Sequence, residues 1–308
     1  MDTHSVIGRF APTPSGSMHL GNILCALISY WSAKSVGGKF LIRIEDLDSA
    51  RCPRSAGEEI LNTLERLGLE SDGEIVWQSE RTEAYKAAEN ILRERAELYP
   101  CFCTRAELHA SHAPRLEDGG VIYDGKCRML DDKLIAELRG VRVPCVRIAV
   151  PDIDISFTDG AVGEQTQNLK NECGDFIIKR SDGVYAYQLA VVADDGASGV
   201  TQVVRGSDLL TSTPRQIYLQ RLLGLKQPDY YHIPLVCAAS GRKLGKSYGD
   251  SAQKMLNEFP PEYIIGALAY AAGMTDRIKE RSATELTADF DWKKIRKDRI
   301  SLPSELCD

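Results

Sequence analysis

Apolar residues near the start of the chain follow first a strand pattern and then a helical one. Residues 6–10 form a short apolar run, and residues 11–17 are rich in proline, serine and glycine. The adjacent Gly37 and Gly38 predict the end of the helix that follows. Its apolar positions recur with the 3.6-residue period of a helix, and they are Leu20, Ile23, Leu24, Leu27, Ile28 and Trp31.

The same alternation of strand and helix continues further along the chain. Residues 39–44 are apolar and β-branched enough for a second strand, and Ile60, Leu61, Leu64 and Leu67 mark one face of a second helix. Strands and helices in alternation predict an α/β fold with a parallel sheet and right-handed crossovers.

The pattern changes between residues 100 and 182, where the segments are short and loop residues are frequent. We predict an inserted subdomain over this range. Asp182 and Gly183 lie between the apolar runs 176–178 and 184–187, which predicts a hairpin.

Helical patterns return in the rest of the chain. Thr213 followed by Pro214 predicts a helix start, two more helices are expected near 251–259 and 261–271, and a charged stretch follows at 277–299. The predicted organisation has four parts. They are the first half of an α/β core at 1–99, the insertion at 100–182, the second half of the core at 183–249 and a C-terminal helical segment at 250–308.

Composition narrows the class of protein. The chain has 308 residues, of which 43% are hydrophobic and 27% charged, and these values exclude disordered, collagen-like and coiled-coil proteins. The N-terminal residues lack the pattern of a signal peptide, and no stretch reaches the roughly 18 apolar residues of a membrane span. We therefore expect a cytoplasmic protein without a membrane partner.

The net charge of −6 does not attract nucleic acid to the molecule as a whole. An RNA partner needs a local basic face, and a solvated helix face explains the same residues equally well. The candidates near the C-terminus are Arg277, Lys279, Arg281, Lys293, Lys294, Arg296, Lys297 and Arg299.

Nine cysteines are scattered along the chain, which is not the pattern of a secreted disulfide framework. Cys101 and Cys103 point to one face of an extended segment, because strand side chains alternate with period two. With Cys127 they offer three soft ligands of the kind that zinc prefers, and a structural zinc site usually has four. By chemistry alone the fourth ligand is His109 or His112. Three reduced thiols without a metal are the alternative.

The proline-rich loop 11–22 joins the first predicted strand to the first helix. Open parallel sheets bind ligands beyond the carboxyl ends of their strands, and a helix N-terminus attracts phosphate. His19 offers a hydrogen-bond donor to phosphate, and Gly21 allows a flat ring to approach the backbone. The alternative is that the prolines and glycines only shape a tight turn.

A second loop, 242–247, carries Lys243 and Lys246 on either side of a small centre. Two ammonium groups at this spacing suit a polyphosphate and the charge that develops in nucleotidyl transfer. A charged run of this kind is more often a solvated surface loop. The two loops together are more informative than either one alone.

Together the loops resemble the HIGH-type and KMSKS-type motifs with which class I aminoacyl-tRNA synthetases bind ATP. Three further stretches resemble the glutamyl-tRNA synthetase branch, namely GRFAPTPSG at 8–16, RIEDLD at 43–48 and VRGSDL at 204–209. Only 61 residues follow Ser247 in the chain of 308, which is too few for a large anticodon-binding region. The chain is therefore most similar to the glutamyl-Q tRNA(Asp) synthetase family.

This resemblance implies a Rossmann-type doubly wound parallel sheet, interrupted by a zinc-bearing insertion and followed by a short C-terminal helical segment. It implies an enzyme that activates L-glutamate with ATP and Mg²⁺ in the absence of tRNA, and then transfers glutamate to the queuosine base at the wobble position of tRNA(Asp). We expect a monomer. The rivals are a compact glutamyl-tRNA synthetase, a non-catalytic module that binds RNA or ligands, and another nucleotidyl transferase on the same core.

The resemblance also implies the residues of each site. The catalytic group is His19, Gly21, Lys243 and Lys246, and the nucleotide site has Pro12, His19, Gly21, Asn22, Lys243, Lys246 and Ser247. The glutamate site has Arg9, Phe10, Ala11, Pro12, Thr13, Glu45, Tyr187 and Arg205. The structural zinc ligands are Cys101, Cys103, Tyr123 and Cys127, with His109 and His112 as the alternatives to Tyr123.

Two positions depart from the general class I pattern. Asn22 stands where the HIGH-type motif ends in histidine, and Gly245 stands where the lysine loop usually has serine. We expect a weaker phosphate or ribose contact at Asn22 and a looser lysine loop. His19, Gly21 and both lysines are retained, so the activation chemistry is expected to be retained as well.

Overall fold

A seven-stranded sheet forms the centre of the computed structural model, which describes residues 5–110, 122–242, 244 and 252–306. The strand order is β3-β2-β1-β9-β10-β6-β7. These strands are β1 (Ile7–Phe10), β2 (Lys39–Ile44), β3 (Val76–Trp77), β6 (Asp154–Asp159), β7 (Gly163–Asn168), β9 (Gln202–Gly206) and β10 (Asp229–Ile233). Neighbours pair in parallel except β6 and β7, which form an antiparallel hairpin at one edge. The predicted α/β class and parallel sheet are confirmed.

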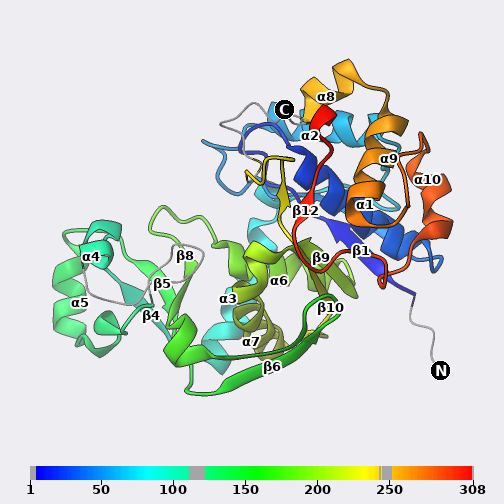
Figure 1. The fold of residues 1–308 in the computed structure, drawn as a ribbon. Helices are drawn as coiled ribbons and strands as arrows, with labels where there is room; N and C mark the ends of the chain where they lie inside the picture. Colours follow the sequence, from blue (N-terminus) through cyan, green and yellow to red (C-terminus); the bar gives the residue numbers. More distant parts are fainter. Residues whose placement is uncertain (1–4, 111–121, 243, 245–251, 307–308) are drawn as a thin grey trace.

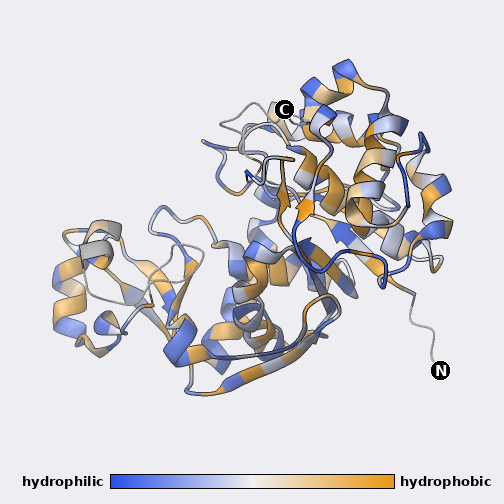
Figure 2. Ribbon diagram, viewed as in Figure 1, coloured by the Kyte–Doolittle hydropathy of each residue, from blue (hydrophilic) through white to orange (hydrophobic). Residues whose placement is uncertain are grey.

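Helices cover both faces of this sheet (Figure 1). One core contains residues of α1 (Leu20–Lys34), α2 (Arg54–Arg66), α8 (Ala252–Glu258), α9 (Pro261–Ala272) and α10 (Ala283–Leu286). The other contains residues of α3 (Thr82–Arg95), α6 (Tyr187–Ala197) and α7 (Thr213–Leu223). The neighbouring residues Val203 and Val204 of β9 belong to different cores, because successive side chains of a strand point to opposite faces. Figure 2 shows α9 largely in apolar colours, as its burial against α1 requires.

The first helix begins and ends as the sequence predicts. His19 and Asn22 cap its N-terminus reciprocally, and the predicted apolar positions are buried. Gly37 adopts a φ of +70°, and a Cβ at Gly38 would lie 2.3 Å from Val6 O. Glycine is therefore required where the chain turns from α1 into β2.

A second unit carries a three-stranded antiparallel sheet of β4 (Leu98–Cys101), β5 (Cys145–Ile148) and β8 (Phe176–Lys179). It also contains α4 (Arg105–Ala110) and α5 (Asp132–Arg139), and Figure 1 shows it as a lobe beside the main sheet. The range 100–182 contributes to both sheets, because β6 and β7 join the edge of the main one through β10.

Two details differ from the sequence predictions. The turn at Gly183 forms with a φ of +88°, but its second arm is short, because Tyr187 is the first residue of α6 rather than part of a strand. Thr213 does not cap α7. Ser212 precedes that helix, and the Thr213 hydroxyl accepts a hydrogen bond from Arg205 instead.

The C-terminal part folds back onto the core. β11 (Val236–Cys237) pairs in parallel with β12 (Ile300–Ser301), and Ile295 from the charged stretch is buried in the core with α1. Among the described residues, no helix has the length and apolar character that crossing a membrane requires.

Candidate functional site

A cavity of about 550 Å³ opens at the carboxyl ends of β1, β9 and β10, beside the N-termini of α1 and α6. Parallel sheets bind ligands at this edge. Every described residue predicted to bind glutamate or the nucleotide lines this cavity: Arg9, Phe10, Ala11, Pro12, Thr13, His19, Gly21, Asn22, Glu45, Tyr187 and Arg205. The motifs that lie far apart in the sequence therefore meet around one space.

One wall of the cavity contains a buried network of opposite charges. Arg43 donates from Nη1 to Asp195 Oδ1 at 2.6 Å and from Nη2 to Glu45 Oε1 at 3.3 Å. Arg9 donates from Nε to the same Asp195 oxygen at 3.3 Å and from Nη1 to Val204 O at 3.3 Å. Asp195 thus fixes two arginines at once, and through Arg43 it also orients Glu45.

Burial and charge act differently on the two carboxylates of this network. Burial raises the pKa of Glu45 above its ordinary range, although Arg43 and Arg9 act in the opposite direction. Burial alone would also raise the pKa of Asp195, but Arg43 and Arg9 outweigh it and hold that pKa below its ordinary range. The arginines therefore favour the ionised form of Asp195, whereas a cationic ligand beside Glu45 would stabilise the ionised form of that buried carboxyl.

Arg205, which is only 4% exposed, lines the cavity from the neighbouring strand β9. It donates from Nε to His232 Nε2 at 2.9 Å, from Nη1 to Gln216 Oε1 at 2.8 Å and from Nη2 to Thr213 Oγ1 at 2.8 Å. A guanidinium group has five N–H donors, so two remain for a ligand in the cavity.

The loop before α1 forms the third side of the cavity. His19 Nδ1 accepts from Asn22 N at 3.3 Å, and Asn22 Oδ1 accepts from His19 N at 3.1 Å. Asn22 therefore caps α1, and the His19 ring proton lies on Nε2. A Cβ at Gly21 would lie 3.0 Å from atoms of this imidazole. In this structure the flat ring beside Gly21 is that of His19 itself.

The predicted lysine loop is only partly described. Lys243, Lys246 and Ser247 lie outside the described residues, as does Gly245. Leu244 is described. It is buried, it lines the cavity, and its backbone N donates to Val236 O at 3.4 Å. Position 244, next to Lys243 in the sequence, thus lies at the cavity.

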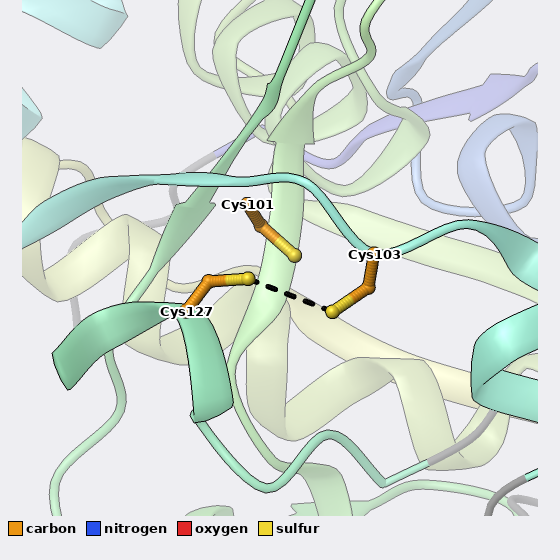
Figure 3. A group of neighbouring side chains, drawn as sticks. All are labelled: Cys101, Cys103 and Cys127. Atoms are coloured by element: carbon orange, nitrogen blue, oxygen red, sulfur yellow. Dashed lines mark hydrogen bonds between the residues drawn. The ribbon is translucent and has the colours of Figure 1, made fainter. Parts of the chain in front are cut away.

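A cluster of thiols lies in the second unit. The sulfur atoms of Cys101, Cys103 and Cys127 lie within 4.8 Å of one another, and Figure 3 shows them pointing toward a common centre. Cys103 Sγ lies 3.5 Å from Cys127 Sγ and 3.5 Å from Tyr123 Oη, which also accepts from Cys127 N at 2.8 Å. The structure therefore brings together the predicted set of three cysteines and Tyr123.

The chemistry of this donor set fits a zinc ion, because three thiols and one phenol lie close together, and all of them except the half-buried Cys103 are buried. The neighbouring Cys145 thiol lowers the pKa of Cys101, whereas burial raises the pKa of Cys103 and of Tyr123. Within this set the thiolate form is therefore favoured at Cys101. The alternative ligand His112 and the side chain of His109 lie outside the described residues.

Sequence reasoning did not identify Asp195 as part of the site. A signal was present, because Asp194 and Asp195 follow the apolar run Leu189–Val192 within α6, and both are buried. A charged pair on the buried side of an apolar helix needs charged partners. Which partners it has could not be read from the sequence.

Comparison with known proteins agrees with this geometry. Residues 5–299 match the family described as tRNA synthetases class I (E and Q), catalytic domain. A relative from Thiobacillus denitrificans named glutamyl-Q tRNA(Asp) synthetase is 46% identical over 250 residues, which are 80% of this chain and 79% of the relative. A protein of the same name from Geobacter sulfurreducens is 49% identical over 242 residues, covering 78% of this chain and 75% of that protein.

A solved structure shares the fold over nearly the whole chain. The crystal structure of glutamate-tRNA synthetase from Elizabethkingia anophelis matches with a TM-score of 0.85 and 28% sequence identity, and the match covers 99% of this chain and 69% of that one. The family match, the relatives and the shared fold lead to one conclusion. The chain belongs to the class I aminoacyl-tRNA synthetases, which are ligases, within the glutamyl-Q tRNA(Asp) synthetase family.

Proposed function

We propose that the cavity activates L-glutamate with ATP in the absence of tRNA, and that the enzyme then transfers the glutamyl group to the queuosine base at the wobble position of tRNA(Asp). The observation that carries the first step is the convergence of Arg9, Arg205 and Glu45 on one cavity beside a helix N-terminus. The acceptor is supported by the names of the relatives.

Glutamate presents two carboxylates and one ammonium group at neutral pH. Glu45 pairs with the ammonium group, because it is a buried carboxylate on the cavity wall. Arg9 and Arg205 bind the carboxylates through the N–H groups that their protein partners leave available. Thr13 and Tyr187 add neutral hydrogen bonds from the same cavity.

Activation needs no nucleophile from the protein. An oxygen of the glutamate α-carboxylate attacks the α-phosphorus of ATP, the new O–P bond forms, and the bond to the leaving pyrophosphate breaks. The N–H groups of the first turn of α1 and the His19 imidazole stabilise the phosphate charge. By their motif, Lys243 and Lys246 neutralise the pyrophosphate, and Mg²⁺ enters with ATP.

The test of this function measures transfer of radiolabelled glutamate, with ATP and Mg²⁺, to three RNAs: queuosine-containing tRNA(Asp), an unmodified tRNA(Asp) transcript and tRNA(Glu). Label is expected only on the queuosine-containing tRNA. Nuclease digestion should then recover it on the anticodon fragment rather than on the 3′-terminal nucleoside.

Other outcomes point to other functions. Label on the 3′ end of tRNA(Glu) would make the protein a compact glutamyl-tRNA synthetase, the activity named for the matched crystal structure. Absence of both label and glutamate-dependent pyrophosphate exchange would exclude an activating enzyme. Omission of ATP is the control in each reaction.

The second unit is proposed to hold one structural zinc ion on Cys101, Cys103, Cys127 and Tyr123. Purified protein is expected to contain about one zinc per chain by plasma mass spectrometry, and Cys127→Ser to lose most of it. Tyr123→Phe should raise the rate at which a chelator removes the metal, because one ligand is lost.

Cys173→Ser is the matched control for these variants, since Cys173 is also buried but belongs to a different core. Its zinc content should equal that of the wild type. Full zinc in Cys127→Ser, or protein that is folded and zinc-free as purified, would contradict the site. If His109→Ala rather than Tyr123→Phe weakens zinc, the fourth ligand is His109.

A further inference from the structure

Arg205 is held by groups that do not themselves reach the ligand cavity. His232 on β10 and Asp159 at the end of β6 are 0% and 1% exposed and do not line the cavity. They nevertheless form a chain of hydrogen bonds that ends on Arg205. The strands that carry these residues, β6, β10 and β9, also pair through their backbones.

The partners of His232 determine which of its nitrogens carries the proton. Arg205 Nε can only donate, so His232 Nε2 must accept this bond of 2.9 Å with a lone pair. The proton therefore lies on Nδ1, which donates to Asp159 Oδ2 at 2.6 Å. The bond from Arg205 requires a neutral ring, and the lowered pKa of His232 agrees with it, because burial outweighs the opposite effect of Asp159.

Asp159 is itself rigidly held. Its Oδ1 accepts from Ala161 N at 2.9 Å, from Val162 N at 3.0 Å and from His232 N at 3.2 Å. The bonds from Ala161 and Val162 tie the carboxylate to the turn between β6 and β7, the bond from His232 N ties it to β10, and Oδ2 is left for the imidazole. The orientation of Oδ2 is thus set by the backbone before any ligand binds.

We propose that Asp159 and His232 are positioning residues that fix the tautomer of the imidazole, and thereby the plane of the Arg205 guanidinium that binds a substrate carboxylate. The proposal rests on the proposed function in so far as that function gives Arg205 a carboxylate to bind. Without the acceptor at Nε2, Arg205 keeps Gln216 and Thr213 on its terminal nitrogens but loses one of the three bonds that hold its guanidinium plane. The turn between β6 and β7 thereby influences glutamate binding from outside the cavity.

The hydrogen bonds from Asp159 through His232 to Arg205 form a relay, and Asp159→Asn tests this relay with little change in side-chain shape. The amide oxygen keeps the backbone donors at the Oδ1 position, so the amide nitrogen faces His232 Nδ1. His232 Nδ1 then has to accept a hydrogen bond from the amide N–H. The ring proton therefore moves to Nε2, where it faces the N–H of Arg205 and the two donors repel each other. The expected result is a rise in the KM for glutamate on the order of tenfold to a hundredfold, with the KM for ATP within about twofold, in glutamate-dependent pyrophosphate exchange.

A second readout follows the proton directly. The ¹⁵N shifts of the histidine ring should place the proton of His232 on Nδ1 in the wild type and on Nε2 in Asp159→Asn, with the signal assigned by its loss in His232→Gln. His232→Gln retains an oxygen acceptor for Arg205, so its KM for glutamate should rise less than that of His232→Leu. A purely structural role would not separate these two variants in this way.

Asp72→Asn is the matched control. Asp72 also accepts from a backbone N–H, Phe40 N at 2.6 Å, and from a cation, Lys34 Nζ at 2.6 Å, but it does not line the cavity. Both KM values should remain those of the wild type.

The outcomes separate this relay from the proposed function. An unchanged tautomer in Asp159→Asn, or equal rises in both KM values, would overturn the relay. If the wild type itself shows no glutamate-dependent exchange, the proposed function fails, and the tautomer measurement still decides whether Asp159 controls His232.

Discussion

Glu45→Gln is expected to lower kcat/KM for glutamate by roughly 10²–10³-fold, because the substrate ammonium group would face a neutral amide in a buried cavity. Arg43 would also lose a charged partner, since its Nη2 lies 3.3 Å from Glu45 Oε1. The backbone bond from Glu45 N to Pro12 O at 2.9 Å is kept, so the loop that lines the cavity stays in place. Glutamate-dependent pyrophosphate exchange measures the effect.

Glu83→Gln is the control for this variant, because the Glu83 side chain is 85% exposed and does not line the cavity. Its kinetic constants should equal those of the wild type. A loss smaller than about tenfold in Glu45→Gln would show that the ammonium group binds elsewhere.

The wild type should also show a pH dependence that comes from Glu45. Binding needs the ionised carboxylate, so kcat/KM for glutamate falls as the pH decreases and Glu45 becomes protonated. Because burial raises the pKa of Glu45, this fall begins at a higher pH than an ordinary glutamate would produce. The Glu45→Gln variant should lack this limb of the profile.

Asp195→Ala is expected to lower the free energy of unfolding by about 3–5 kcal/mol, measured by urea denaturation. The substitution leaves Arg9 and Arg43 buried without the carboxylate that they share, and their charges then repel each other. Removing one partner of a buried ion network costs far more than removing a surface pair. Glutamate activation should be lost as well, because both arginines are part of the cavity wall or support it.

Lys170→Ala is the comparison for a surface pair. Lys170 and Asp152 are 60% and 56% exposed, so the change in unfolding free energy should stay below about 1 kcal/mol. If Asp195→Ala does not fold, Asp195→Asn should show a smaller loss in the same direction, since it keeps one acceptor for the arginines. A loss below about 1 kcal/mol in the alanine variant would mean that solvent reaches these charges.

The cavity could be anticipated because its residues lie on short contiguous motifs. Arg9, Thr13 and His19 come from one loop, and a loop that follows a strand and precedes a helix must lie at the carboxyl edge of a parallel sheet. The thiol cluster could also be predicted from the sequence, since Cys101 and Cys103 are two positions apart in an extended segment. The prediction that Tyr123 joins these thiols came from a family resemblance and not from residue spacing.

Other features depend on contacts between distant segments. The sequence pattern placed Tyr187 in a strand, yet it begins α6, because the second arm of the hairpin ends once the chain packs against α3 and α7. Thr213 was expected to cap α7, and it binds Arg205. In each case a local propensity was overridden by a partner that only the folded chain supplies.

The sequence by itself determined the early strands and helices, the glycines at the end of α1 and the loops that carry the motifs, because these depend on periodicity and on backbone sterics over a few neighbouring residues. Only the tertiary structure decided how the charges are paired. Asp195 meets Arg43 across 152 residues, and Asp159 meets His232 across 73. A buried charge is stable only beside its partner, and no local pattern specifies which distant side chain that partner will be.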